Sequence, residues 1–180
     1  MEKPVIRTVG HSTRPVEALI EMLKAHGVER LIDVRAVPKS RYNPQYSREA
    51  LERSLRETGI GYEHMKGLGG LRHPRKDSPN TGWRNESFRG YADYMGTPEF
   101  EAALAALLGA AAHERVAILC AEAVPWRCHR SLISDALTAR GYRVEHIMSV
   151  SKSAPHTMTP FARVEGTSVT YPADAQERLF

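Results

Sequence analysis

The chain alternates between short apolar runs and segments whose apolar residues recur at helical spacing, and this alternation restricts the fold more than any other feature. The run at 29–35 (ERLIDVR) is typical of a strand buried on both faces, and a helix is expected over 48–58. Strands that alternate with helices form a mostly parallel sheet with helices on both faces. We therefore expect a Rossmann-like, three-layer α/β fold with a mostly parallel sheet of about five strands. The expected strands are residues 4–9, 29–35, 60–65, 115–120 and 142–147.

We expect a single α/β domain over residues 1–148 and an irregular C-terminal tail, 149–180, packed on that domain. A length of 180 residues is usual for one domain, and no linker divides the chain. The tail mixes Ser, Thr and Pro, with the pattern of a short hairpin over 162–172. Residues 71–86 have no periodicity and many turn formers, which predicts a long loop; such loops are usually functional or disordered.

Composition restricts the compartment and the partners. The 42% apolar and 26% charged residues are typical of a soluble globular protein. Neither a signal peptide nor an apolar run long enough to span a bilayer is visible, so we expect no membrane association. Two cysteines are too few for a disulfide scaffold, which favours a cytoplasmic location. The net charge of +4 is compatible with an anionic partner.

The residues that follow the expected strands differ in character from those that precede them. They are polar or glycine-rich, whereas the strand starts carry little beyond an occasional charge. Ligands of parallel α/β sheets bind beyond the carboxyl ends of the strands, so this asymmetry predicts a site there. Single members also have plain structural uses; Asp33 and Arg35, for example, could simply pair with neighbours. We assign substrate or anion binding to Ser12, Asp33, Arg35, Ser40, Arg41, Gly69, Gly70 and Arg130.

Cys128 lies beside the start of the helix expected over 129–140, where the positive end of the helix favours a thiolate. Arg127 and Arg130 add positive charge. A thiol in this setting is a candidate nucleophile or redox centre, and a histidine nearby supplies general acid–base catalysis. The alternative is an inert cysteine at a helix start with exposed cations. The candidate catalytic residues are His11, Cys120, Glu122, Cys128 and His129.

A metal site is the second interpretation of the same side chains. Cys120, Cys128, His129 and His11 are ligand types that zinc accepts. The seven residues between the two cysteines match no compact zinc motif, and the chain has no CxxC. We therefore assign no metal ligand, and no motif specifies a cofactor.

Three functions are compatible with these residues. The first is a Cys/His-dependent enzyme that acts on a small phosphorylated or nucleotide-like anion, with 71–86 closing over it as a lid. The second is a nucleic-acid-binding or processing module that uses the basic and aromatic residues of 72–94. The third is a thiol redox or metal sensor built on the two cysteines.

Six segments stand out as motifs: TVGHS at 8–12, LIDVRAVPKSR at 31–41, GLGG at 67–70, FRGYADYM at 88–95, ILCAEAVPWRCHRSLISDAL at 118–137 and VEHI at 144–147. Together they resemble the bacterial and archaeal family labelled domain of unknown function 488. The resemblance implies a compact cytosolic α/β protein and brings no established reaction. The loop after Cys120 is also similar in layout to rhodanese-like domains, in which backbone amides after a catalytic cysteine hold an anion. Here the loop is longer and contains Glu122, Pro125 and a second cysteine.

Overall fold

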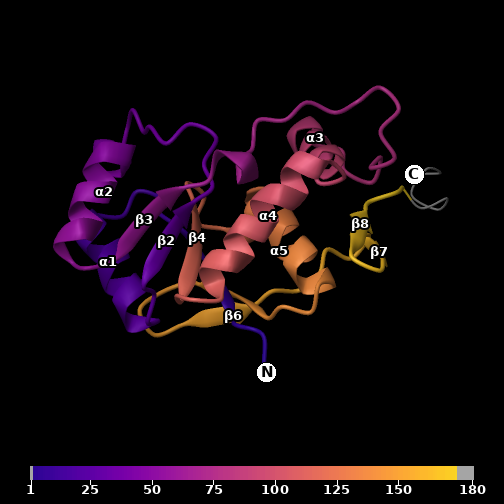
Figure 1. The fold of residues 1–180 in the computed structure, drawn as a ribbon. Helices are drawn as coiled ribbons and strands as arrows, with labels where there is room; N and C mark the ends of the chain where they lie inside the picture. Colours follow the sequence, from indigo (N-terminus) through magenta and orange to yellow (C-terminus); the bar gives the residue numbers. More distant parts are fainter. Residues whose placement is uncertain (1, 174–180) are drawn as a thin grey trace.

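The structure, a computed structural model, describes residues 2–173 and contains one large sheet (Figure 1). Its six strands run in the order β3-β2-β4-β1-β5-β6. The first five in this order are parallel, and β6 pairs with β5 in the antiparallel direction. The expectation of a mostly parallel sheet of about five strands is confirmed. The strands are β1 (Ile6–Gly10), β2 (Arg30–Asp33), β3 (Gly61–His64), β4 (Val116–Cys120), β5 (Val144–Ile147) and β6 (Ser153–Pro155).

Five α-helices are described, and their starts follow from local chemistry. Helix α4 begins where Thr97 accepts a hydrogen bond from the amide of Phe100 and Pro98 takes the first helical position. Helix α3 begins where the side chain of Asn85 accepts from the amide of Phe88. The helices are α1 (Val16–Ala25), α2 (Arg48–Glu57), α3 (Glu86–Tyr94), α4 (Pro98–Ala111) and α5 (Arg130–Ala139), with 3-10 turns η1 (Pro44–Tyr46), η2 (Lys66–Leu68) and η3 (Pro125–Arg127).

The helices cover both faces of the sheet, as the sequence predicts (Figure 1). Alternate residues of β4 point to opposite faces. Ile118 and Cys120 belong to the core that also contains residues of α3, α4 and α5, whereas Ala117 and Leu119 belong to the core with α1 and α2. The thiol of Cys120 therefore lies on the same side of the sheet as α5.

The tail is more ordered than the sequence indicates. It contributes β6 to the sheet and forms the hairpin of β7 (Arg163–Glu165) and β8 (Ser168–Thr170), which confirms the pattern over 162–172. Strand β6 was not predicted, because all three of its residues are exposed and leave no apolar alternation. Residues 174–180 of the predicted tail lie outside the described residues.

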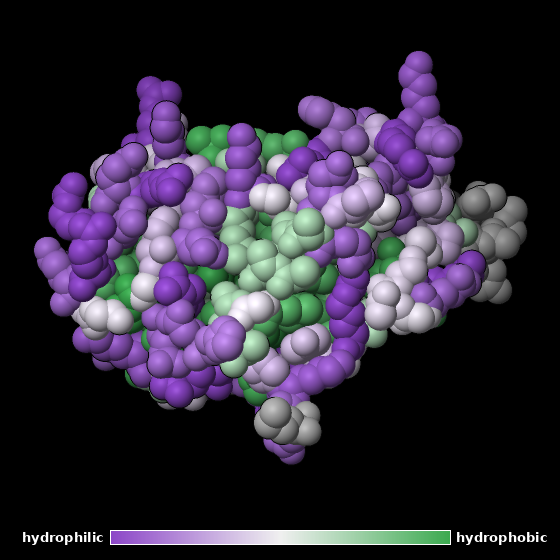
Figure 2. Space-filling view, in the orientation of Figure 1, coloured by the Kyte–Doolittle hydropathy of each residue, from purple (hydrophilic) through white to green (hydrophobic). Residues whose placement is uncertain are grey.

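Hydrophilic side chains dominate the face that Figure 2 shows, with a paler, mildly hydrophobic band where α4 lies in Figure 1. The exposed residues of this helix include Ala102, Ala105 and Ala106. Among the described helices, none has the length and apolar character that a membrane span requires.

A crevice forms at the carboxyl ends of β1 and β4. These two strands are neighbours, with Gly10 paired to Cys120. After β1 the chain enters α1 on one face, and after β4 it enters α5 on the other. Where adjacent parallel strands lead to opposite faces, the loops diverge and leave room for a ligand. This is the position at which the sequence predicts a site.

Candidate functional site

A pocket of about 730 Å³ opens at this edge of the sheet. Its walls come from the segments that follow β1, β2 and β4, and from residues in and near α3. The volume lies in the range that holds a small-molecule ligand. The pocket brings together most of the predicted site residues, which are far apart in the sequence: His11, Ser12, Arg35, Ser40, Gly70, Cys120, Glu122, Cys128 and His129.

Four predicted site residues do not line this pocket. Asp33 is fully buried beneath Arg35, and Arg130 is 1% exposed. Arg41 is exposed on the loop after β2, where its guanidinium lies 5.9 Å from the ring centre of Tyr42. Gly69 packs against the backbone of Ala36, so that an added Cβ would lie 2.9 Å from the Ala36 Cα atom.

Arg35 is held in one orientation by Asp33. Its Nε and Nη2 atoms donate to the two carboxylate oxygens over 2.9 and 2.7 Å, a bidentate pair. The hydroxyl of Tyr62 donates to the same carboxylate over 2.5 Å. Burial, followed by this hydrogen bond, raises the pKa of Tyr62, so the phenol keeps its proton. The remaining Nη1 atom of Arg35 points to His11, at 3.4 Å from His11 Nε2.

His11 is a neutral imidazole with a defined tautomer. Its Nδ1–H donates to the carbonyl of Ser12 over 2.7 Å, so Nε2 carries the lone pair. The ring stacks on Tyr46 with centroids 4.1 Å apart. Burial is the main cause that lowers the pKa of His11 below 6.5, and the charge of Arg35 adds to it. The arrangement places an unprotonated nitrogen in the pocket wall.

The two cysteines form a coupled pair. Burial alone would raise the pKa of Cys120, but a hydrogen bond from Cys128 and the charge of Arg130 lower it overall. The hydrogen bond to Cys120 and burial raise the pKa of Cys128 well above its ordinary value. The backbone amide of Arg130 also donates to Cys128 Sγ over 3.4 Å. The pKa of Cys120 is thus lowered and that of Cys128 is raised; Cys120 Sγ also lies 3.5 Å from the carbonyl oxygen of Glu122, to which its thiol can donate. Both side chains are free thiols and line the pocket.

Arg130 is a buried cation without a carboxylate partner among the described residues. Its Nη2 atom donates to the carbonyls of Glu122 and Ala123, over 3.0 and 2.9 Å. Its Nε and Nη1 atoms are buried and have no hydrogen-bond partner in the part of the chain that the structure describes. A buried charge is costly unless it is compensated. The charge of Arg130 contributes to the lowered pKa of Cys120, and it opposes without reversing the raised pKa of Cys128.

His129 connects the start of α5 to Val34, the residue that follows β2. Its Nε2–H donates to the carbonyl of Val34 over 2.8 Å, and its Nδ1 lies 3.6 Å from Cys128 Sγ. Burial lowers the pKa of His129 to about 4, so the ring is neutral near pH 7. Gly70 packs on this ring, since a Cβ there would lie 3.2 Å from Nδ1.

Backbone segments around the pocket approach one another closely, and two residues there have strained backbone angles. A Cβ on Gly10 would lie 1.7 Å from the carbonyl oxygen of Glu122, so only glycine lets the β4 loop approach β1. Ser12 (φ 51°) and Leu71 (φ 59°) are the non-glycine residues with positive φ within residues 2–173. Both line the pocket. Left-handed backbone in such residues is strained and tends to occur at ligand sites.

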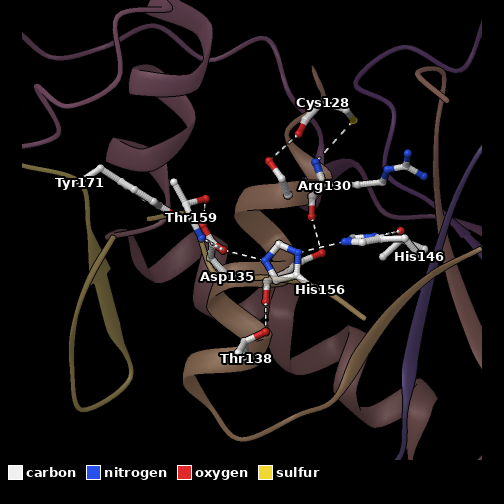
Figure 3. A network of polar contacts seen from close by, with 11 residues as sticks. Cys128, Arg130, Asp135, Thr138, His146, His156, Thr159 and Tyr171 are labelled. Atoms are coloured by element: carbon white, nitrogen blue, oxygen red, sulfur yellow. Dashed lines mark hydrogen bonds and ion pairs between the residues drawn. The ribbon is translucent and has the colours of Figure 1, made fainter. Parts of the chain in front are cut away.

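A second polar network lies along α5 and binds the tail to the domain (Figure 3). Its centre is the fully buried Asp135. The carboxylate accepts from His156 Nε2 (2.7 Å), from both the amide and the hydroxyl of Thr159 (3.1 and 2.7 Å) and from the Tyr171 hydroxyl (2.8 Å). His156 Nδ1 lies 2.9 Å from His146 Nε2. Burial, with the nearby His156 and Arg130, lowers the pKa of His146 to about 3.

The sequence interpretation missed this network. One signal was available: Asp135 lies on the apolar face of α5, between Ile133 and Ala136, where a carboxylate requires buried donors. The sequence does not indicate which residues donate to Asp135, because the donors lie 21 to 36 residues further along the chain.

The aromatic residues of 72–94 serve mainly as core. Trp83 packs against Phe88, Phe161 and Tyr171, with ring centroids 4.8–5.5 Å apart. Tyr91 is buried, and the guanidinium of Arg72 covers the ring of Tyr94 at 3.6 Å. These rings are engaged within the domain, which removes the observation that favoured base stacking. Among residues 2–173, no three His, Cys, Asp or Glu side chains are grouped as metal ligands.

Fold and site together define a parallel α/β protein with a thiol- and arginine-containing pocket at the carboxyl edge of its sheet. Comparison with protein families gives a match to "Domain of unknown function DUF488" over residues 15–137, more than half of the chain. The chain belongs to this family. No curated protein and no solved structure matches it.

Proposed function

We propose that the protein is a Cys/His-dependent enzyme that binds a small phosphorylated or nucleotide-like anion and attacks it with Cys120. The observation that carries this proposal is the buried guanidinium of Arg130, which has no carboxylate partner among the described residues and lies beside the two thiols. A thiolate on Cys120 supplies the missing negative charge. Since a thiolate is the reactive form of cysteine, the compensation of charge also activates the nucleophile.

The charges of the pocket wall favour an anionic substrate. Arg35, Lys39 and Arg127 line it, against the single carboxylate of Glu122. The Nη1 atom of Arg35, whose printed contact is the long one of 3.4 Å to His11 Nε2, is the donor best placed for the anion, because Asp33 fixes the rest of the guanidinium. Ser12 and Ser40 offer further hydroxyl donors in the same wall.

The chemical step follows from these positions. The Cys120 thiolate forms a bond to an electrophilic atom of the substrate, and the leaving group departs with the electron pair of the broken bond. The thiol of Cys128 supplies the proton that the leaving group takes up. His11 Nε2 then accepts a proton from the water that attacks the covalent adduct, and the bond to Cys120 Sγ breaks with its electron pair returning to the sulfur. The proton on His11 passes to Cys128, which restores the starting state. The free thiols require a reducing compartment, for which we propose the cytoplasm.

The test is the pH dependence of alkylation by iodoacetamide, with each cysteine followed by mass spectrometry. We expect Cys120 to react at pH 7 faster than a free cysteine, and inorganic phosphate to protect it. The Cys128→Ser variant retains a modifiable Cys120, whereas Cys120→Ser leaves no fast-reacting thiol. If both thiols react no faster than free cysteine and no anion protects them, the proposal is wrong.

The presence of two free thiols in one pocket wall favours a thiol redox sensor as a second candidate function. One peroxide molecule would oxidise the two thiols to a disulfide and be reduced to water. Thiol counts before and after mild peroxide, and again after a thiol reductant, test it. Two free thiols throughout would exclude this function.

A further inference from the structure

Exposed apolar side chains line the mouth of the pocket. On protein surfaces such side chains are usually scattered singly, whereas here they lie together. Val37 is 55% exposed and Leu71 is 75% exposed, and both line the pocket. Apolar groups gathered at a concave site are typical of ligand contact.

The lining residues differ in exposure, which distinguishes an inner from an outer part of the pocket wall. The buried members of the wall include the polar His11 and Arg35, at 3% and 7% exposure, together with Tyr91, Cys120 and Cys128. The more exposed part of the wall includes Val37, Leu71, Phe88 and Val124, together with Lys39, Arg127 and polar side chains such as Ser40 and Ser87. A ligand that fills this shape has its charge at the inner end and its apolar part at the outer end.

The backbone of Leu71 supports the same conclusion. Leucine is disfavoured at a φ of 59°, and a side chain this exposed gains little packing in return. Strain of this kind persists where the position of the side chain serves a ligand. Leu71 also follows Gly70, which packs directly on His129, so the residue is fixed relative to the reactive end.

We infer that the ligand is an amphipathic anion: a phosphate or similar group near Arg35 and Cys120, joined to an aryl or acyl body that lies against Leu71, Val37 and Phe88. This inference rests on the proposed function and names its substrate class. The apolar body contributes binding energy outside the reacting centre, which an enzyme uses to position the anion.

The experiment measures protection of Cys120 against iodoacetamide by inorganic phosphate, phenyl phosphate and 1-naphthyl phosphate. The half-protecting concentration should fall along this series, by about fourfold for each methylene equivalent buried. Naphthyl phosphate should bind at least tenfold more tightly than inorganic phosphate. 1-Naphthol, which lacks the anion, should protect far less than naphthyl phosphate.

Two rim variants locate the apolar contact. Leu71→Ser and Val37→Thr should each weaken protection by naphthyl phosphate about fivefold and leave inorganic phosphate unchanged. Val164→Thr is the matched control, because Val164 is 41% exposed on the β7–β8 hairpin and does not line the pocket. Alkylation rates without ligand report whether each variant keeps the intact site.

The outcomes separate the inference from the proposed function. Equal protection by the three phosphates, or equal loss in Val164→Thr, overturns the amphipathic substrate and leaves the anion site in place. No protection by any of the three overturns the proposed function itself.

Discussion

Two polar clusters flank the N-terminal half of α5, and they differ in how completely they are hydrogen-bonded. The Asp135 cluster is satisfied: its carboxylate accepts four hydrogen bonds from three residues of the tail. The pocket cluster is not, since Arg130 has two buried nitrogens without a partner in the described chain. A complete network stabilises a fold, whereas an incomplete one leaves capacity for a ligand or a reactive charge.

This difference predicts which cluster can lose a charged side chain without a large loss of stability. Removing Asp135 leaves buried donors without an acceptor, so stability should fall. Removing Arg130 deletes a charge that the described fold does not neutralise, so reactivity should change more than stability. The predictions below test this division, beginning with the largest expected effect.

The Asp135→Ala substitution should lower the free energy of unfolding by roughly 3 to 5 kcal/mol, the usual cost of removing one partner of a buried, hydrogen-bonded pair. Urea denaturation measures this. Tyr171→Phe is the graded control: it removes one of the four hydrogen bonds and should cost about 1 kcal/mol. A loss below 1 kcal/mol in Asp135→Ala would mean that the tail is not held by this network.

Acid should destabilise the protein through one histidine of each cluster. The pKa of His129 is lowered to about 4 and that of His146 to about 3, so the unfolded state binds their protons first as the pH falls below 6.5. Stability is therefore present above pH 6.5 and is lost towards pH 4. Each histidine contributes a slope of about 1.4 kcal/mol per pH unit in this window.

Urea denaturation at pH 6.5 and at pH 4.5 measures these slopes. His129→Gln and His146→Gln should each remove one contribution, and the double variant both. If the free energy of unfolding changes with pH equally in the unmodified protein and in both single variants, neither histidine is buried in the neutral form.

The sheet could be predicted because its evidence is local. Runs such as Val116–Cys120 are apolar throughout, and parallel pairing brings residues that follow separate strands to one edge. This reasoning placed His11, Arg35 and Cys120 in one pocket although 109 positions separate the first from the last. It did not predict β6, whose pairing to β5 depends on backbone hydrogen bonds rather than on side-chain pattern.

The exact placement of individual site residues could not be predicted from the sequence. Whether Arg130 faces the pocket or the core depends on how the β4 loop folds back, which brings the carbonyls of Glu122 and Ala123 to its guanidinium. The sequence assigns Gly69 and Gly70 to anion binding, but a glycine pair has the same pattern when it only permits close packing, as Gly69 does against the backbone of Ala36. These distinctions are set by tertiary contacts and carry no sequence pattern.

The Arg130→Met substitution should slow alkylation of Cys120 at pH 7 about tenfold, because loss of the buried charge raises the pKa of the thiol and lowers the fraction of reactive thiolate. Arg127→Met is the matched control, because Arg127 is an exposed cation in the same loop; its effect should stay below twofold. Arg130→Lys, which keeps the charge, should recover most of the rate. Equal slowing by both methionine variants would assign the effect to general electrostatics.

The smallest expected effect concerns the strained rim of the pocket. Leu71→Gly should raise the free energy of unfolding by about 0.5 to 1 kcal/mol, because glycine adopts a φ of 59° without the steric cost that leucine has there. The same variant loses the apolar side chain and should bind naphthyl phosphate more weakly. Stability and binding thus change in opposite directions, which is the behaviour of a residue retained for a ligand.

Val37→Gly is the control for this last prediction. Val37 is also exposed at the rim, but its φ is not positive, so glycine should lower stability there by about 0.5 to 1 kcal/mol. Opposite signs for the two variants in urea denaturation would show that the strain is specific to Leu71. If both variants change the free energy of unfolding in the same direction, the strained backbone of Leu71 no longer supports a ligand contact. The exposure of the two side chains would then be the remaining evidence for an apolar contact at the rim.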